Sequence, residues 1–332
     1  MKHEKMSYYD DKVKTLKRLF GTDDIFVGPD HLKVASRIYP IIQDVIILSG
    51  DGMGHGLQKE KDGKGGQEIF ARDIQYTFSE EWKAYDRILP EHEKEFSRYF
   101  DIVDLKSLSG ARVCDLGCGI GRWSYFLKDI CRELVLVDFS DAIFVARCNL
   151  ASCKHALFFK GDIKQLPFKN DFCDFLFCLG VLHHLPTPCL EEVRSLRKYA
   201  PQLLIFLYYA LDNRPVYFRF LLGMVTLLRQ WLCKIRSPLF RKVFSVMGAL
   251  FIYKPMILIG KILRPFHLSS RVPLYDFYHD KSFRRIEQDV YDRFFTRIEQ
   301  RVTRRDIMML KDSFSEIRIS ENFPYWHFLC FR

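Results

Sequence analysis

Val113-Cys-Asp-Leu-Gly-Cys-Gly-Ile-Gly-Arg-Trp123 is the stretch that decides the fold of this 332-residue chain. Its first four residues predict the end of a buried parallel strand. A helix is expected to begin near Arg122. Between the two, closely spaced glycines predict a turn where the backbone passes close to a ligand: Gly117, Gly119 and Gly121. The stretch is therefore typical of a loop that holds a nucleotide.

The charge around this loop indicates which nucleotide it holds. A dinucleotide fold needs a third glycine at a fixed spacing so that a pyrophosphate can approach a helix N-terminus, but Arg122 and Ser124 occupy those places. Asp115 precedes the turn, where a carboxylate repels phosphates and attracts a cation. The ammonium or sulfonium of S-adenosylmethionine fits this pattern better than NAD does.

Two further acids follow the next two apolar runs. Asp138 comes 23 residues after Asp115, where a carboxylate can accept both ribose hydroxyls, and Asp162 comes 24 residues later, where it can accept the adenine amino group. Each acid taken alone is also typical of an ordinary turn or helix cap. Three acids in this order and spacing favour a cofactor site.

These residues resemble the class I S-adenosylmethionine-dependent methyltransferases, in particular the branch with the ubiquinone and menaquinone C-methyltransferases. The resemblance covers residues 90–211 and resumes near Asp292, and its most specific pieces are 113–121, 134–141, 161–168 and 172–185. Together with the acids above, it predicts a set of cofactor-binding residues: Asp115, Gly117, Cys118, Gly119, Gly121, Asp138, Phe139, Ser140, Asp162, Ile163, Leu179 and Gly180.

Apolar runs alternate with helical patterns and predict a parallel sheet covered by helices on both faces. Strands are expected near 111–117, 133–139, 156–161, 173–179 and 202–210. The resembled fold ends in an antiparallel hairpin, which residues 313–320 and 325–332 would form. We therefore predict an α/β, Rossmann-like, seven-stranded doubly wound sheet with a C-terminal antiparallel hairpin, a small N-terminal module and a helical insertion. The expected boundaries are 1–75 for the module, 76–212 for the methyltransferase core, 213–275 for the insertion and 276–332 for the end of the core.

The N-terminal module carries a weaker signal. Residues 7–20 predict a helix, and residues 36–48 predict two short strands around a turn at 42–44. This second segment resembles part of the small zinc-ribbon activator subunits of some methyltransferases. No cysteine precedes Cys114, so zinc binding is excluded, and either the module has lost its metal or the likeness is chance.

Two features between the module and the core concern flexibility and a lid. Residues 60–67 mix lysine, glycine and aspartate and predict an exposed linker. Trp82 and Tyr85 are candidates for a lid over the cofactor, although packing of these rings on the sheet is the favoured interpretation.

Composition excludes a disordered protein, because 48% of the residues are hydrophobic and 15% are aromatic. The ten cysteines include no Cys-x-x-Cys pair and several lie in apolar strands. Reduced core cysteines explain them better than disulfides or a metal site, so no metal is expected. The first residues lack the apolar segment of a signal peptide, which favours a cytoplasmic protein.

The net charge of +10 is concentrated in residues 213–275, which carry eleven Lys and Arg residues and no acid. Cations and Pro255 interrupt the apolar stretches 216–232 and 243–263, which argues against crossing the bilayer. Apolar helices with only positive charge suit the interface of an anionic, cytoplasmic leaflet. A helical lid with solvated cations is the competing interpretation. Nucleic acid fits less well, because its binding surfaces are polar.

Methyl transfer to an acidic O–H or C–H also needs a base, and His183 after the fourth strand is the candidate. A structural role for this histidine is the competing interpretation. Asp289, Tyr291, Asp292 and Arg293 can reach the acceptor pocket, but a surface network is the favoured explanation for them.

We therefore expect a peripheral, S-adenosylmethionine-dependent methyltransferase that acts on a hydrophobic or lipid-linked acceptor at the inner face of the membrane. A transfer-RNA or protein methyltransferase and a non-catalytic cofactor-binding module are the alternatives. No acceptor motif distinguishes O-, N- and C-methylation, and nothing in the sequence indicates the oligomeric state.

Overall fold

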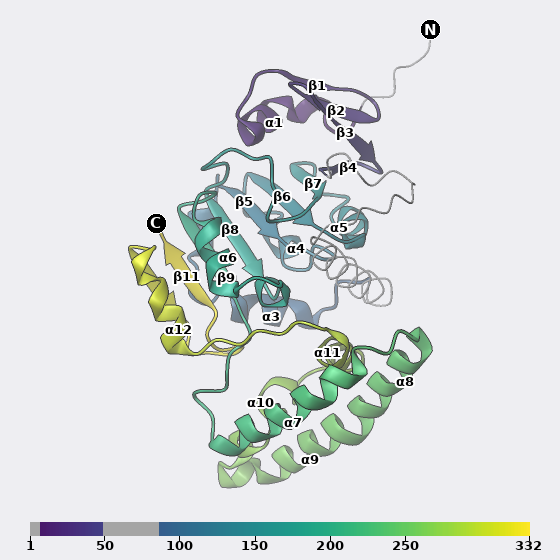
Figure 1. Cartoon of the computed structure of the whole chain (residues 1–332), viewed down its shortest axis with the longest axis vertical. Coiled ribbons are helices and arrows are strands. Elements are labelled where there is room, and N and C mark those ends of the chain that lie inside the picture. The colour runs from purple at the N-terminus through teal and green to yellow at the C-terminus, as the bar shows by residue number, and fades with distance from the viewer. Residues whose placement is uncertain (1–6, 49–85) are drawn as a thin grey trace, which may run out of the picture.

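One mixed sheet of eleven strands forms the centre of the protein. The computed structural model describes residues 7–48 and 86–332, and Figure 1 shows three regions stacked along its long axis. The N-terminal module lies at one end, the sheet with its flanking helices lies in the middle, and a group of helices lies at the other end. The strands are hydrogen-bonded in the order β1-β2-β3-β4-β7-β6-β5-β8-β9-β11-β10.

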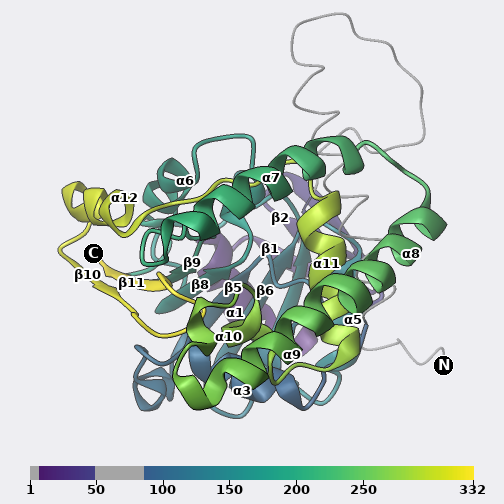
Figure 2. The same ribbon diagram turned by 90° about the horizontal axis from the view of Figure 1, so that it is seen from below.

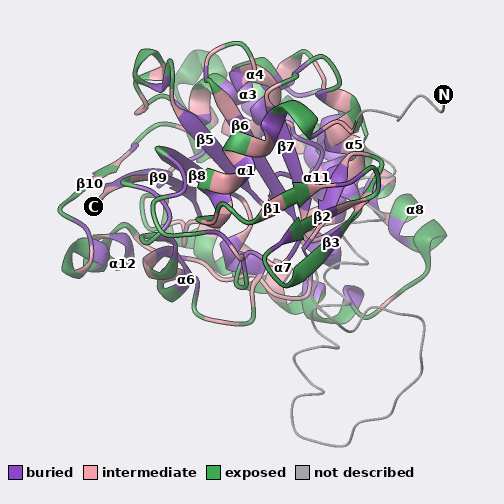
Figure 3. Cartoon of the chain, turned by 90° about the horizontal axis from the view of Figure 1, so that it is seen from above, coloured by how far each residue is buried: buried purple, intermediate pink, exposed green. Residues whose placement is uncertain are grey.

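Five parallel strands make up the middle of the sheet, and their apolar side chains are almost entirely buried because helices cover both faces (Figure 3). They agree with the five predicted strands: β5 (Arg112–Leu116), β6 (Glu133–Asp138), β7 (Ala156–Lys160), β8 (Phe175–Leu179) and β9 (Gln202–Phe206). The helices packed on one face are α1 (Val13–Phe20), α6 (Cys189–Leu196) and α12 (Arg304–Met308), and those on the other are α3 (Glu91–Tyr99), α4 (Ser124–Leu127) and α5 (Ala142–Asn149).

The C-terminal hairpin is present as predicted. Strand β11 (Phe328–Phe331) runs antiparallel to both β9 and β10 (Glu316–Ile319). These two strands and the five parallel strands are the seven that the sequence predicts.

The expected total of seven strands is nevertheless wrong, because the N-terminal module continues the same sheet. Its four strands are β1 (Ile25–Val27), β2 (His31–Val34), β3 (Arg37–Ile42) and β4 (Val45–Ile47). Strand β4 pairs in parallel with β7, and the hydroxyl of Tyr9 donates to the carbonyl of Asp44 at 2.6 Å and to that of Phe158 at 3.2 Å. The module thereby covers a sheet edge that would otherwise expose unpaired backbone groups.

Some of the other predictions for the N-terminal module can be compared with the structure, and others fall on residues outside the described part of the chain. The helix in residues 7–20 and the two strands around the turn at 42–44 are confirmed. The predicted linker at 60–67 and the lid candidates Trp82 and Tyr85 lie outside the described residues.

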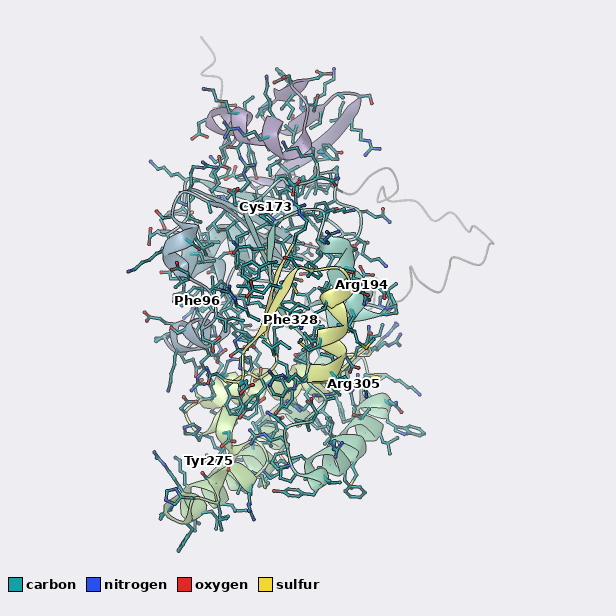
Figure 4. The ribbon with its side chains drawn as sticks, turned by 90° about the vertical axis from the view of Figure 1, so that its left-hand side faces the viewer. Phe96, Cys173, Arg194, Tyr275, Arg305 and Phe328 are labelled. Atoms are coloured by element: carbon teal, nitrogen blue, oxygen red, sulfur yellow. The ribbon has the colours of Figure 1, made fainter. Side chains whose placement is uncertain are left out.

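The helical end of the molecule contains α7 (Val216–Leu232), α8 (Pro238–Gly248), a π-helical turn (Ala249–Tyr253), α9 (Lys254–Leu263), α10 (Tyr275–Tyr278) and α11 (Phe283–Phe295). These helices lie nearest the viewer in Figure 2, and Tyr275 marks their end of the molecule in Figure 4. A separate apolar cluster joins the π-helical turn to α11 through Ala249, Tyr253, Ile286 and Val290. The helical unit therefore extends past the predicted boundary at residue 275.

Helix α8, the π-helical turn and α9 form part of one continuous helix, Pro238–Phe266. With 29 residues and a mean hydropathy of 1.8 over its most apolar window, it is the one described helix long and apolar enough to span a membrane. This length differs from the interrupted stretches expected from sequence. One of its faces is packed against protein, because a side chain at Gly260 would collide with Tyr275 and one at Gly248 would meet Val290.

Candidate functional site

The glycine loop after β5 has the conformation that the sequence predicts. Gly117, Gly119 and Gly121 all have positive φ angles, of 76°, 52° and 74°. A side chain at Gly117 would lie 2.4 Å from Val181, so only glycine fits there. At Gly121 a side chain would press on Ala146, which means that this glycine serves packing against α5. The following helix begins at Ser124.

Asp138 lies at the tip of β6 and fixes this loop. Its Oδ2 accepts the N–H of Gly119 at 2.7 Å, while its Oδ1 accepts the N–H of Ser140 at 2.8 Å and the hydroxyl of Ser140 at 2.6 Å. Burial raises the pKa of this carboxyl above its usual value, and the three hydrogen bonds oppose that shift. The predicted ribose acceptor is therefore rigidly held beside the loop.

Asp115 is buried at the end of β5. Its Oδ2 accepts the hydroxyl of Ser124 at 2.8 Å. Burial raises the pKa of this carboxyl to about 8, against the hydrogen bond from Ser124, and the neighbouring charge of Asp138 adds to the shift. A cation bound nearby would stabilise the ionised form of this buried carboxyl.

Asp162 follows β7 and is half-buried. Its Oδ1 accepts the N–H of Lys164 at 2.9 Å, and the N–H of the adjacent Gly161 donates to the carbonyl of Asp138 at 2.9 Å. The three predicted acids therefore lie at or just after the carboxyl ends of three neighbouring strands, β5, β6 and β7. Their contacts with a cofactor stay predictions.

A cavity of about 560 Å³ begins at the glycine loop and extends toward the helical end. Five of the predicted cofactor residues line it: Gly117, Cys118, Gly119, Leu179 and Gly180. The remaining predicted residues do not line this cavity: Asp115, Gly121, Asp138, Phe139, Ser140, Asp162 and Ile163. Of these, Ile163 packs in the core, and the hydroxyl of Ser140 donates a hydrogen bond to Asp138.

Several side chains in the cavity wall were not predicted. Tyr208, just after β9, and Trp123, just after the glycine loop, line the cavity. Asp289, Asp292 and Arg293 of α11 also line it, so the interpretation of these residues as a surface network is wrong. The sequence feature that could have indicated their place in the cavity wall is their position near residue 292, where the resemblance to the methyltransferases resumes.

The carboxylates of the cavity wall differ in their partners. Asp276 is paired with Arg214 at 2.8 Å, and Asp289 is paired with Arg285. Asp292 instead accepts two hydroxyls, from Tyr208 at 2.9 Å and from Thr296 at 2.8 Å. Asp292 is thus a cavity carboxylate oriented by neutral donors.

His183 does not line the cavity. It is fully buried, and its ring stacks on Tyr208 with 3.9 Å between centroids. Burial lowers the pKa of this imidazole well below its usual value, which disfavours the protonated form that a base must reach. The geometry favours a packing role, and the assignment of His183 as the base stays a prediction.

The residues present fit S-adenosylmethionine. Gly117 and Gly119 lie in the cavity wall, and Asp138 supplies a buried carboxyl that is hydrogen-bonded to the loop. Burial keeps Asp115 protonated up to about pH 8 in the cofactor-free protein, and a nearby cation would favour its ionised form. A cationic ligand offsets the burial of such carboxylates, whereas a pyrophosphate would be repelled. Asp115 and Asp138 would hold the cofactor, together with the loop backbone.

Comparison with known proteins agrees with this assignment. Residues 113–199 match the family described as "Methyltransferase domain". A curated relative, the tRNA U34 carboxymethyltransferase of Trichodesmium erythraeum (strain IMS101), is 28% identical over 139 residues, which are 41% of this chain and 38% of the relative. The chain therefore matches well under half of that relative's length.

Solved structures with similarity to the chain include phosphoethanolamine N-methyltransferase 1 of Haemonchus contortus, at 20% identity and a TM-score of 0.36 over 42% of this chain and 32% of that one. Another is a SAM-dependent methyltransferase of Aquifex aeolicus, at 21% identity and a TM-score of 0.27 over 44% and 72%. Both TM-scores lie below 0.5.

The expectation of an S-adenosylmethionine-dependent methyltransferase domain is confirmed for residues 113–199. The narrower likeness to the ubiquinone and menaquinone C-methyltransferases is not confirmed.

Asp138→Asn should weaken binding of S-adenosylmethionine by about tenfold or more, because one acceptor oxygen becomes an amide that faces N–H donors. Isothermal titration calorimetry measures the affinity. Asp141→Asn is the matched control, since this exposed carboxylate three residues away is paired with Lys160, at 2.5 Å. Equal affinities in the two variants would contradict the assignment of Asp138.

Asp115→Asn should change how stability depends on pH. The folded protein holds a proton on Asp115 up to about pH 8, whereas the unfolded chain releases it near 3.8. The free energy of unfolding therefore falls as pH rises between these values, by up to about 1.4 kcal/mol per pH unit from this group. Urea denaturation of the cofactor-free protein from pH 5 to pH 8 should give a shallower decline for Asp115→Asn. Asp129→Asn, at an exposed position, should follow the unmodified protein.

Proposed function

We propose that this chain, whose residues 113–199 are a methyltransferase domain, transfers the methyl group of S-adenosylmethionine to a hydrophobic or lipid-linked acceptor at an anionic membrane surface. The observation that carries the proposal is the cavity that joins the glycine loop to the apolar helices α7 and α9. When bound, the cofactor supplies an electrophilic methyl group on a sulfonium.

The cavity supports an apolar acceptor because its far wall is made of apolar side chains. Helix α7 contributes four of them, and the π-helical turn and α9 contribute two more: Phe218, Leu221, Leu222, Val225, Ile252 and Met256. Such a wall excludes water and aligns the acceptor, which are the main requirements of a displacement reaction.

Asp292 is the group best suited to accept the proton that the acceptor releases. Its carboxylate lies in the cavity wall, and the hydroxyls of Tyr208 and Thr296 orient it. A positioned base of this kind typically contributes about 10²–10⁴-fold to the rate.

The outer surface of the helical end supports a membrane location. In the described part of the chain, 20 of the 25 exposed large apolar side chains lie between residues 216 and 268. Exposed aromatic side chains on α7 and the adjoining helix include Phe220 at 68%, Trp231 at 73% and Phe251 at 62%. An apolar surface of this extent is typical of a protein or membrane contact.

Of the eleven Lys and Arg residues between 213 and 275, three have side chains held inside the protein and eight are exposed. Arg214, Arg229 and Arg241 are engaged inside the protein, Arg229 and Arg241 with backbone carbonyls. The other eight are exposed: Arg219, Lys234, Arg236, Lys242, Lys254, Lys261, Arg264 and Arg271. Exposed cations around an apolar face favour an anionic leaflet, with about 1 kcal/mol for each one near the surface.

Binding to the surface fits better than crossing the bilayer. The helix Pro238–Phe266 buries Gly248, Tyr253, Ile257 and Gly260 against the rest of the protein, so only its other face is available to lipid. Such one-sided exposure is typical of a helix in the membrane interface.

A transfer-RNA methyltransferase is the second candidate, favoured by the curated relative and by the basic charge. The exposed apolar side chains count against it, because nucleic-acid surfaces are polar and charged.

Incubation with methyl-labelled cofactor and a whole-cell extract should put the label into the organic-solvent fraction. Asp292→Asn should slow that labelling by about 10²–10⁴-fold, because it removes the proton acceptor. Asp129→Asn should leave the rate unchanged. Extraction into solvent, RNA and protein fractions, followed by scintillation counting, measures the outcome.

Label in the RNA or protein fraction would contradict the hydrophobic acceptor and indicate an RNA or protein acceptor instead. Absence of label from every fraction, with cofactor binding intact in calorimetry, would favour a non-catalytic cofactor-binding module.

The protein should float with vesicles that contain phosphatidylglycerol and bind vesicles of phosphatidylcholine alone more weakly. A triple variant, Phe220→Ser with Trp231→Ser and Phe251→Ser, should lose most of the floated fraction, because it removes apolar area from the face that enters the interface. The matched control is a triple serine variant at exposed apolar positions of the N-terminal module, Phe26, Ile38 and Ile42.

Alkaline carbonate should release the bound protein, since it would lie on the membrane. Resistance to carbonate would indicate a membrane-spanning helix, and failure of the intact protein to float with either vesicle would remove the membrane from the proposal.

A further inference from the structure

The cavity opens onto the exposed apolar face at the helical end. Leu221 of α7 and Ile252 of the π-helical turn both line the cavity, yet 40% and 50% of their surfaces are exposed. Residues that belong to both surfaces mark a mouth between the two helices. An apolar chain could therefore extend from the cavity through this mouth without leaving apolar surroundings.

The cavity wall also carries many charged side chains. Five arginines and three aspartates line it: Arg122, Arg214, Arg285, Arg293, Arg301, Asp276, Asp289 and Asp292. Arg214 and Arg285 are paired with Asp276 and Asp289. Arg301 is paired with Glu299, at 2.6 Å. Glu95 lies 3.2 Å from Arg285 and 4.0 Å from Arg122. Four of the five arginines therefore have a carboxylate partner.

Arg293 is the arginine of this wall that has no bound carboxylate. Among residues 7–48 and 86–332, no carboxylate oxygen lies within 4.0 Å of its guanidinium, and its Nε is buried without an acceptor. Asp292 is its neighbour in the chain, but it accepts the hydroxyls of Tyr208 and Thr296.

Arg293 interacts with the hydroxyl of Tyr253 and, at longer range, with the charge of Glu299, but it has no directly bound anion. An anionic ligand in the cavity would supply one and offset the cost of burying this guanidinium. Its planar set of donors matches the oxygens of a phosphate or a carboxylate, which it can bind with two parallel hydrogen bonds. The chemistry of Arg293 therefore calls for an anionic group in the cavity.

We propose that the acceptor is an anionic amphiphile, whose phosphate or carboxylate head binds Arg293 and whose chain leaves through the mouth between Leu221 and Ile252. This inference rests on the proposed function, since it takes the cavity as the acceptor site. The head lies between the mouth and the glycine loop, so its reactive group faces the methyl donor while the chain stays in the bilayer.

Calorimetry on the full chain tests this with three probes: monomeric dihexanoyl phosphatidate, neutral dihexanoylglycerol and inorganic phosphate. The phosphatidate should bind about tenfold or more tightly than either of the others, because only it has both the anion and the chains. Arg293→Met should remove that preference, and Arg293→Lys should keep part of it. Arg305→Met, at an exposed position on α12 outside the cavity, should bind all three probes like the unmodified protein.

A second pair of variants tests the mouth without altering the buried wall. Leu221→Glu puts a negative charge at the mouth and should weaken phosphatidate binding by about tenfold. Leu227→Glu makes the same change on the same helix at an exposed side chain outside the cavity, and should have no effect. Binding of S-adenosylmethionine by each variant reports that it is folded.

The outcomes separate this inference from the proposed function. Equal affinity for phosphatidate and dihexanoylglycerol, or no effect of Arg293→Met and Leu221→Glu, would overturn the anionic amphiphile. Equal affinity for inorganic phosphate and phosphatidate would indicate a site for free phosphate and overturn it as well. Failure of the unmodified protein to bind S-adenosylmethionine would instead overturn the proposed function.

Discussion

The N–H of Gly119 donates to the carboxylate of Asp138, and this contact joins the glycine loop after β5 to the tip of β6. The loop can make the contact because Gly117 and Gly119 adopt positive φ, which brings the backbone over the ends of the parallel strands. With the loop fixed there, its open side faces the cavity, and its other side packs on α5 through Gly121. The cavity begins at this point, where Gly117, Cys118, Gly119 and Ile120 line it.

The opposite wall of the cavity depends on contacts between segments far apart in the sequence. Buried Glu95 of α3 binds Lys281 at 2.6 Å and Arg285 of α11 at 3.2 Å, which ties the start of the core to the helical end. The positive neighbours keep the pKa of Glu95 low despite its burial. Because α11 is anchored in this way, Asp289, Asp292 and Arg293 are presented to the cavity. The main effect of such a buried charge cluster is to fix the position of α11 relative to α3, because the cost of desolvating the charges offsets much of their attraction.

The sequence predicted the parts of the fold that depend on local patterns. Apolar runs ending in Asp115, Asp138 and near Asp162 located β5, β6 and β7, and the glycines located the loop. The junction between β4 and β7 was not predictable, because pairing between distant strands leaves no trace in the composition of either. Arg293 was misjudged for a similar reason: whether a charged helix residue faces solvent or a cavity depends on the partner helix. His183 was chosen by residue type and position after β8, and neither property reveals that Tyr208 lies over its ring.

The helical end has apolar surfaces on both of its sides, and this distinguishes it from an ordinary lid. A lid on a soluble enzyme has one apolar face toward the site and a polar face toward water. Here the inner face contacts α11 and the cavity, while side chains such as Phe220 and Trp231 point outward. Exposed apolar area of this extent is unfavourable in water, so the arrangement makes physical sense where another apolar phase covers it. Under the function proposed here, that phase also holds the acceptor's chain, so membrane binding and acceptor choice follow from one set of side chains.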